Sequence, residues 1–270
     1  MTSRPPIDIV TLGDVSVAYR RSGAGQRVVM IHGLGQDHRI WEDLQRQLDD
    51  FETVAYDIRG HGSSTLGDAN GTIAQLGRDL LSLLEEIGPA VCIGFSLGGT
   101  IALWAAAQRP VLVPAVIAIA TSSVVGRVAA ASMDDRISQV LAGDRNVLRA
   151  IIEQDTLSQL AGFEVDVEYL VESRMEAIGE ADGYLNGARA VRAMRDEPLN
   201  GRLDAITQPV LIVSGSIDSW CPRKAADIML EHLSNASFEE LDGVGHLVTD
   251  IAPGALLAVV RPWLLKLETS

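Results

Sequence analysis

One serine of this sequence stands in a pattern that can make it a nucleophile. The stretch "VCIGFSLGGTIALW", residues 91–104, starts as a β-branched run, bends through glycines around Ser96 and continues as alanine- and leucine-rich helical text. Gly-Phe-Ser-Leu-Gly fits the Gly-x-Ser-x-Gly elbow, a sharp strand-to-helix turn that exposes the serine hydroxyl. The five residues alone can match by chance, but a strand before them and a helix after them are the context that the motif requires. We therefore predict that Ser96 is a nucleophile.

A serine hydroxyl is a poor nucleophile at neutral pH, so this chemistry needs a histidine base. His246, in "DGVGHLVTD", falls between the last predicted strand and the last predicted helix. It would therefore lie at the carboxyl end of a strand, as Ser96 does. We predict that His246 is the base, the alternative being a capping or loop-packing role. The other histidines lie in or beside glycine loops or in a charged helical run: His32, His38, His61 and His232.

The histidine in turn needs a carboxylate to orient it. Asp218, in "VSGSIDSWCP", follows a predicted strand at its carboxyl end. The chain order Ser96, Asp218, His246 is that of serine hydrolases with a nucleophile elbow, and differs from the chymotrypsin and subtilisin orders. We predict that Asp218 is the orienting acid, the alternative being a structural loop aspartate.

Acyl transfer through a tetrahedral intermediate also needs two N–H donors for the oxyanion. "MIHGLGQ" follows a predicted strand directly, so the backbone N–H of Leu34 can face that of Leu97 across the serine. The alternative is a glycine turn that only reverses the chain.

The elements that must hold these residues alternate along the chain. "IDIVTL" and "VSVAYR" flank Gly13-Asp14 and predict an N-terminal β-hairpin. Further short β-branched runs are mostly separated by helical segments such as residues 75–87 and 97–108, which predicts an α/β fold with a mostly parallel, doubly wound sheet. The runs are "RVVMI", "TVAYD", "AVCIG", "VPAVIAIA" and "PVLIVSG". The strand "SFEEL" and a helix over 253–267 end the pattern.

Between two of these strands the β-pattern stops. Residues 122–203 hold helix-compatible text such as "RNVLRAIIEQDTLSQL", which predicts an inserted helical block. The core would then consist of residues 1–121 and 204–270.

Composition and charge narrow the classes of partner that this protein could bind. The chain has 270 residues, and 47% hydrophobic with 21% charged residues predict an ordinary globular protein. Its 22 Lys and Arg against 36 Asp and Glu give a net charge of −14, which disfavours nucleic acid and anionic membranes as partners. The longest apolar run, residues 111–120, is too short to span a bilayer. The opening residues show no secretory signal, so we expect a cytoplasmic protein with Cys92 and Cys221 as reduced thiols.

Taken together, "HGLGQDHRIW", "YDIRGHGSS", "GFSLGG", the Asp218 loop and "GVGH" resemble the α/β-hydrolase fold superfamily over nearly the whole chain. "HGLGQDHRIW", "LGRDLLSLLEEIG" and "DGYLNGARAVRAM" are most similar to 3-oxoadipate enol-lactonases and neighbouring small esterases. One departure is Gly33, where enol-lactonases often carry serine. The resemblance implies that residues 122–203 are a cap, or lid, over Ser96.

The enol-lactonase resemblance also implies an anionic lactone, which needs a local cation in a chain of this net charge. Arg39 can pair with a carboxylate through two parallel hydrogen bonds, the alternative being a surface arginine at a helix start. Trp41 and Trp220 are either packing residues or pocket walls. Loop architecture is the expected role of a further set in "DIRGHGSS": Asp57, Arg59 and His61.

The sequence thus predicts a serine hydrolase for a small-molecule ester or lactone, with no metal and no organic cofactor. Hydrolysis of a C–C or amide bond by the same three residues remains open, as does a non-hydrolytic receptor or cofactor-free oxygenase of the same fold. Epoxide hydrolases and haloalkane dehalogenases are disfavoured because they place an aspartate where this chain has Ser96. The glycine loops lack the Gly-x-Gly-x-x-Gly spacing of a dinucleotide site. The oligomeric state is left open.

Overall fold

Eight strands form one sheet in the computed structural model, which describes residues 6–160 and 162–268. The sheet order is β1-β2-β4-β3-β5-β6-β7-β8, and every pairing from β4 to β8 is parallel. The predicted α/β class with a mostly parallel, doubly wound sheet is confirmed, although the outermost predicted core residues, 1–5 and 269–270, lie outside the described chain. The strands are β1 (Asp8–Leu12), β2 (Val15–Ser22), β3 (Arg27–Ile31), β4 (Glu52–Tyr56), β5 (Val91–Phe95), β6 (Val116–Ile119), β7 (Val210–Gly215) and β8 (Ala236–Leu241).

The predicted N-terminal hairpin is present. β1 and β2 pair antiparallel with Leu12 opposite Val15, so Gly13 and Asp14 form the turn. Gly13 takes a φ of 63°, a left-handed conformation that glycine adopts without steric cost. β2 also pairs antiparallel with β4, which joins the hairpin to the edge of the parallel sheet.

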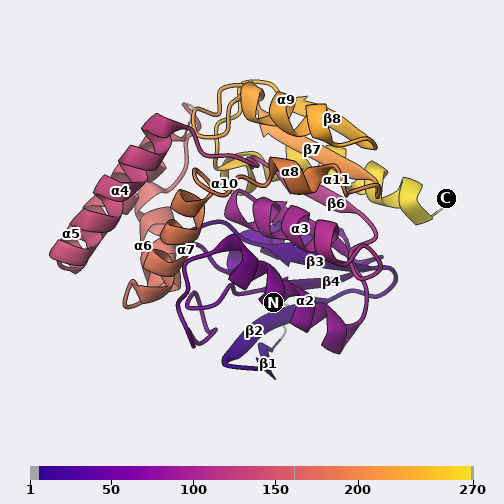
Figure 1. The fold of residues 1–270 in the computed structure, drawn as a ribbon, viewed down its shortest axis with the longest axis horizontal. Coiled ribbons are helices and arrows are strands. Elements are labelled where there is room, and N and C mark those ends of the chain that lie inside the picture. The colour runs from indigo at the N-terminus through magenta and orange to yellow at the C-terminus, as the bar shows by residue number, and fades with distance from the viewer. Residues whose placement is uncertain (1–5, 161, 269–270) are drawn as a thin grey trace.

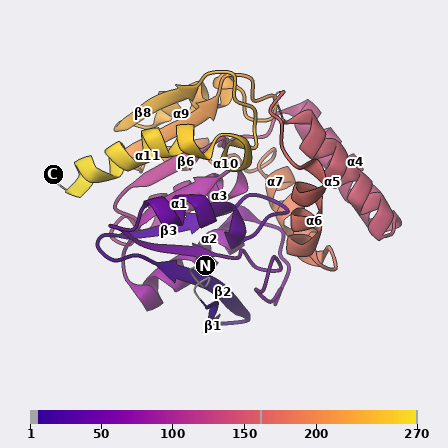
Figure 2. The same cartoon turned by 180° about the vertical axis from the view of Figure 1, so that it is seen from behind.

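Helices cover both faces of the sheet (Figure 1). α2, α3, α8 and α9 lie on one face, while Figure 2 shows α1 and α11 on the other. Successive side chains of the central strands point to opposite faces of the sheet in turn. Cys92 packs into the core under α2 and α3, and Ile93 into the core under α1 and α11. Burial on both faces explains why these strands read as continuous apolar runs. The covering helices are η1 (His38–Trp41), α1 (Glu42–Gln47), α2 (Ile73–Ile87), α3 (Leu97–Gln108), α8 (Asn200–Leu203), α9 (Arg223–His232), α10 (Val248–Ile251) and α11 (Pro253–Glu268).

Between β6 and β7 the chain forms helices that gather at one end of the sheet (Figures 1 and 2). The predicted helical block is present there, and its helices share a small core of their own that includes Ile152, Met175 and Tyr184. We call these four the inserted helices: α4 (Arg127–Ala142), α5 (Arg145–Ser158), α6 (Val167–Ile178) and α7 (Asp182–Ala193). That residues 122–203 form a separate cap domain stays a prediction.

The apolar run over residues 111–120 is only partly a strand. β6 covers Val116–Ile119, and Val111 is exposed. Pro114 has no N–H for a sheet ladder, which fits the later start of the strand. Among the described residues, no helix is both long enough and apolar enough to cross a membrane.

Candidate functional site

Ser96 occupies the turn between β5 and α3 in a strained conformation. Its φ of 51° and ψ of −117° lie in a region that L-residues rarely adopt. The surrounding chain holds it there, because its N–H donates to the carbonyl of Ile119 at 2.8 Å and its own carbonyl accepts from Thr121 Oγ1 at 2.6 Å. The turn therefore has the form of the predicted nucleophile elbow.

The two glycines of the elbow are required by close backbone contact. A Cβ on Gly94 would lie 2.2 Å from the carbonyl oxygen of Gly98. A Cβ on Gly98 would lie 2.1 Å from the carbonyl oxygen of Ile31, at the end of β3. The second contact brings the start of α3 against the loop that carries Leu34.

The three predicted side chains are joined by hydrogen bonds. His246 Nε2 lies 3.1 Å from Ser96 Oγ, and His246 Nδ1 lies 2.8 Å from Asp218 Oδ2. Asp218 Oδ1 accepts from the backbone N–H of Trp220 at 2.8 Å and of Cys221 at 2.9 Å. The side chains of Asp218 and His246 are almost wholly shielded from solvent. The Asp218–His246 pair is therefore shielded from bulk solvent, while Ser96 stays partly exposed.

The other four histidines and Asp242 form contacts with groups other than Ser96. His32 Nε2 accepts from the N–H of Ile58 at 2.9 Å, and burial lowers the pKa of this imidazole. Burial also lowers the pKa of His61 to about 4, and its Nε2 accepts from the Gly35 N–H at 3.3 Å. Asp242 contacts Ser216 at 3.3 Å and is exposed. Two further histidines pair with aspartates away from Ser96: His38 with Asp57 and His232 with Asp204.

The predicted oxyanion donors have no hydrogen-bond acceptor within the protein. Within the described residues, the backbone N–H groups of Leu34 and Leu97 donate to no protein acceptor. α7 packs over both leucines, since a Cβ on Gly187 would lie 2.7 Å from Leu34 Cδ1 and 3.3 Å from Leu97 Cδ2. Both amides are thus left without a protein acceptor, next to side chains that α7 covers.

The three predicted substrate-binding residues are placed differently from one another. The Trp220 ring centre lies 4.9 Å from that of His246, and the side chain is 42% exposed, as a pocket wall requires. Trp41 has no exposed surface and belongs to the core under α1 and α11, which favours its packing alternative.

Arg39 is already engaged by protein acceptors. Its guanidinium pairs with Asp37 at 2.7 Å and with Glu176 at 2.6 Å, and it donates to the carbonyl of Ser173 at 2.8 Å. A guanidinium with these partners has little left to offer a ligand carboxylate, which argues against the predicted anion site at Arg39. The sequence could not show this, because Glu176 is separated from Arg39 by 137 positions.

The loop after β4 serves as architecture, as expected. Arg59 pairs with Asp79 at 2.7 Å and with Asp14 at 2.9 Å, and Asp57 Oδ1 accepts from the His38 N–H at 2.8 Å. These contacts tie the loop to the hairpin and to α2.

Sequence reasoning missed two residues around the serine. The Phe95 ring centre lies 5.2 Å from that of His246, and Thr121 anchors the elbow carbonyl. The position of Phe95 inside the Gly-x-Ser-x-Gly motif was a usable signal. Thr121 gave none, because its contact depends on the pairing of β5 with β6.

In the described part of the chain, two groups of potential metal ligands lie close together: Asp218, Cys221 and His246, and Asp37, His38 and Asp57. Each contains a histidine–aspartate hydrogen bond of 2.8 Å, so both are accounted for by their own contacts. Both cysteines are free, and burial, with the nearby Asp218 charge, raises the pKa of the Cys221 thiol well above its usual range. The absence of a metal from the chemistry stays a prediction.

Comparison with known proteins identifies the family of the fold. A family model described as alpha/beta hydrolase fold matches residues 26–253. The chain is 28% identical over 242 residues to 3-oxoadipate enol-lactonase 2 of Acinetobacter baylyi, covering 87% of this chain and 88% of the relative. It is 25% identical to 2-(acetamidomethylene)succinate hydrolase of Mesorhizobium japonicum, covering 93% and 92%. A solved structure of a hydrolase from Pseudomonas aeruginosa superposes with a TM-score of 0.84 at 28% identity, covering 96% of this chain and 98% of the other.

Proposed function

The chain belongs to the α/β-hydrolase fold family, and we propose that it is a serine hydrolase that cleaves an ester or lactone of a small organic acid through an acyl-enzyme. The observation that carries this proposal is the unbroken hydrogen-bond chain from Ser96 through His246 to Asp218. The similarity to an enol-lactonase supports an ester or lactone as the bond that is cleaved.

In the proposed reaction, Ser96 Oγ attacks the carbonyl carbon while its proton passes to His246 Nε2. Asp218 accepts the Nδ1–H, fixes the tautomer and stabilises the imidazolium that forms. The imidazolium then gives its proton to the leaving alkoxide as the ester C–O bond breaks, which leaves an acyl group on Ser96. His246 then takes a proton from a water molecule, whose oxygen attacks the acyl carbon; the bond from that carbon to Ser96 Oγ breaks, the proton returns to Oγ and the acid is released.

The negative charge of the tetrahedral intermediate would be held by the N–H groups of Leu34 and Leu97. Because neither N–H donates to a protein acceptor among the described residues, no hydrogen bond within the protein has to break before the oxyanion can be bound. Loss of one such donor in other enzymes costs roughly 10²–10³-fold in kcat. The proposed mechanism draws on no metal and no organic cofactor.

The inserted helices are the proposed cap, with residues 122–203 as its extent. α7 touches the side chains of both oxyanion residues through Gly187, and Gln159 Nε2 donates to Ser219 Oγ at 3.1 Å, next to Asp218. A change in these helices would therefore alter access to Ser96 without altering the three reacting side chains.

Two other functions use the same residues. Cleavage of an amide or C–C bond would need the same chain of hydrogen bonds, and one relative is a 2-(acetamidomethylene)succinate hydrolase. A receptor or cofactor-free oxygenase would retain a reactive serine without turnover.

The proposal is tested with a fluorophosphonate probe and a panel of lactones, aryl esters, amides and vinylogous diketones. We expect stoichiometric labelling of Ser96, turnover of an ester or lactone, and neither in Ser96→Ala. Faster turnover of an amide or diketone would move the assignment to those bonds. Labelling without turnover of any substrate would favour a non-hydrolytic protein.

A further inference from the structure

The direction of the Leu34 N–H depends on the glycine before it. This N–H belongs to the planar peptide group that joins Gly33 to Leu34, so rotation about the backbone bonds of Gly33 turns the donor. Glycine adopts more backbone conformations than other residues. A side chain at position 33 would displace its neighbours, because a Cβ there would lie 2.9 Å from Phe95 Cδ1 and 3.0 Å from Gln36 Oε1. The proposed donor therefore follows a glycine that other groups must hold.

Two buried side chains hold Gly33, one at each of its hydrogen-bonding groups. Because His32 Nε2 accepts from the Ile58 N–H, the proton of the neutral imidazole is on Nδ1. His32 Nδ1 donates this proton to the Gly33 carbonyl at 2.7 Å. The Gly33 N–H donates to Gln36 Oε1 at 3.3 Å. These two contacts restrict the rotations that would turn the Leu34 N–H away.

Gln36 is in turn anchored to the segment that follows the proposed base. Since its Oε1 accepts an N–H, its Nε2 is the donor, and it donates to Asp250 Oδ2 at 3.3 Å. The same oxygen accepts from Thr249 Oγ1 at 3.1 Å. Asp250 belongs to α10 and comes four residues after His246. One side chain therefore connects the loop that carries Leu34 with the segment that follows His246.

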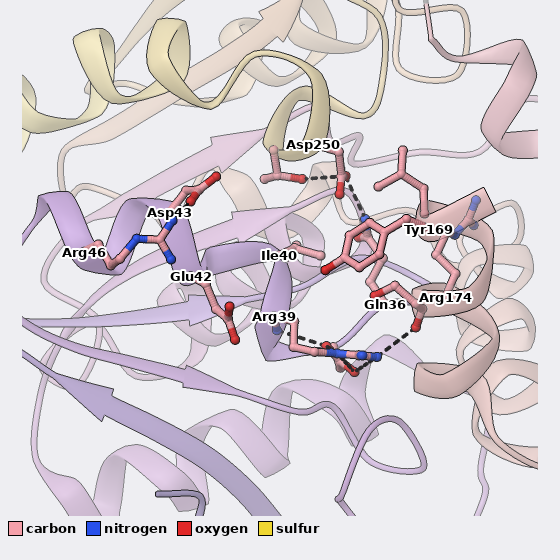
Figure 3. A pocket seen from close by; sticks show the side chains of 13 residues that line it. Gln36, Arg39, Ile40, Glu42, Asp43, Arg46, Tyr169, Arg174 and Asp250 are labelled. Carbon is pink, nitrogen blue, oxygen red and sulfur yellow. Dashed lines mark hydrogen bonds and ion pairs between the residues drawn. The ribbon is translucent and has the colours of Figure 1, made fainter. Parts of the chain in front are cut away.

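Figure 3 shows this contact at the wall of a cavity of about 380 Å³, with Gln36 and Asp250 facing each other. Arg174 of α6 and Arg46 of α1 line the same cavity, and Arg46 lies at its far end. Burial raises the pKa of Asp250 to about 6, so its carboxyl is ionised at pH 8. At that pH the hydrogen bond from Gln36 is charge-assisted, which is the stronger kind.

We propose that Gln36 is a positioning residue, which aims the Leu34 N–H at the oxyanion, and that Asp250 is its anchor. The inference rests on the proposed function and adds the group that keeps one oxyanion donor in register with the base. A residue that acts only on a transition-state donor changes kcat and leaves KM nearly unchanged. A residue that only fills space changes stability instead.

Gln36→Met tests the positioning role, because methionine keeps the length of the side chain and removes both hydrogen bonds. At pH 8, we expect kcat for 4-nitrophenyl acetate to fall about tenfold, less than for loss of a whole oxyanion donor, and KM to stay within about twofold. An unchanged kcat, or a rise in KM that accounts for the whole loss, would overturn the proposal.

The thionoester O-(4-nitrophenyl) thionoacetate makes the readout specific for the oxyanion. Sulfur is a weaker hydrogen-bond acceptor than oxygen, so this substrate draws less on the Leu34 donor. In Gln36→Met its kcat should therefore fall by less than about threefold. Equal losses on the two substrates would show general damage to the site and would overturn the positioning role.

A matched pair of variants at position 250 tests the anchor. Asp250→Asn keeps an oxygen for Gln36 Nε2, whereas Asp250→Leu keeps a similar volume and offers no acceptor. We expect kcat to fall about tenfold in Asp250→Leu and by at most about threefold in Asp250→Asn. Gln36→Met combined with Asp250→Leu should lose no more than either change alone, because both remove the same contact. Additive losses would overturn the anchoring.

Arg46→Met is the control for changes to the same cavity. Arg46 pairs with Asp43 and is largely exposed, and neither residue contacts Gln36 in the described structure. We expect kcat of this variant to stay within about twofold for both substrates. A loss as large as that in Gln36→Met would assign the effect to the cavity as a whole.

Two further measurements separate this inference from the proposed function. If wild type turns over neither substrate, the rate at which the fluorophosphonate labels Ser96 replaces kcat, since the phosphoryl oxygen would use the same donors. If Ser96 is not labelled either, hydrogen exchange of the Gly33 amide decides. Exchange should be roughly tenfold faster in Gln36→Met than in wild type, because the Gly33 N–H loses its acceptor. Equal labelling rates, or equal exchange where no labelling occurs, would overturn the proposal.

Discussion

Asp218 and Arg174 are both buried charged residues, yet their surroundings differ. Each oxygen of Asp218 has a donor, and the carboxylate is matched by the imidazole that becomes positive in the proposed reaction. Arg174 has two neutral acceptors, an unpaired Nε and a cavity beside it. A fully satisfied polar network is preorganised for a step that the protein performs by itself. A buried charge that its neighbours match only in part has no such preorganisation.

Ser96→Ala should have the largest effect on the hydrogen-bonded network of Ser96, His246 and Asp218. We expect kcat for the best ester to fall by roughly 10⁴-fold or more, because the nucleophile is lost while the fold remains. Steady-state kinetics and circular dichroism would measure the two effects. A variant that keeps a tenth of wild-type turnover would remove the acyl-enzyme mechanism.

Asp218→Asn should have the next largest effect. The backbone N–H groups of Trp220 and Cys221 would keep the amide oxygen, so the amide N–H would face His246 Nδ1 and hold the imidazole proton on Nε2. Nε2 could then not accept the Ser96 proton, and kcat should fall roughly 10³–10⁴-fold with the fold intact. Asp242→Asn is the matched control, since that exposed acid contacts Ser216 and not His246. If the control were crippled and Asp218→Asn were active, the orienting acid would be Asp242.

Gly98→Ala tests the backbone that supports the network. Its Cβ would collide with the Ile31 carbonyl, so β3 and α3 must separate and the Leu34 and Leu97 amides with them. We expect about 1–3 kcal/mol of destabilisation from overpacking and at least a roughly tenfold loss of kcat. Thermal melts and kinetics would check both. Gly254→Ala, where nothing lies within 4 Å of the added Cβ, should leave Tm and kcat near wild type.

Strain at Ser96 predicts a stability change that can be separated from activity. Ser96→Gly should melt at a higher temperature than Ser96→Ala, since only glycine adopts a φ of 51° and a ψ of −117° without steric cost. The expected difference is about 1 kcal/mol, measured by denaturant or thermal unfolding of the two inactive variants. Equal stabilities would show that the surrounding contacts leave no strain in the turn.

Arg39→Ala should have the smallest effect on substrate choice. Its guanidinium joins Asp37 to Glu176 and Ser173 of α6, and such a partly exposed ion pair contributes about 0–1 kcal/mol. We expect changes below about threefold that are equal for a carboxylated and a neutral ester, measured as kcat/KM. A selective tenfold rise in KM for the carboxylated ester would restore Arg39 as the anion site.

The sequence was most informative where local order along the chain decides the structure. The elbow around Ser96 was predictable because its glycines, its strand and its helix are contiguous, and the sheet was predictable because its strands are buried on both faces. The proximity of His246 and Asp218 to Ser96 was predictable because the carboxyl ends of parallel strands meet at one edge of a sheet.

What only the tertiary structure decided depends on contacts between distant segments. Arg39 and Arg174 look alike in the sequence, but one meets carboxylates and the other meets neutral acceptors and a cavity. The sequence likewise gives no reason to treat Trp41 and Trp220 differently. In the structure, Trp41 is wholly enclosed under α1, whereas Trp220 lies beside His246. The type and spacing of residues determined the chemistry that this chain can attempt. The packing of the inserted helices against the sheet determined which charges are paired, because pairing of charges is a property of distance in space and not of order along the chain.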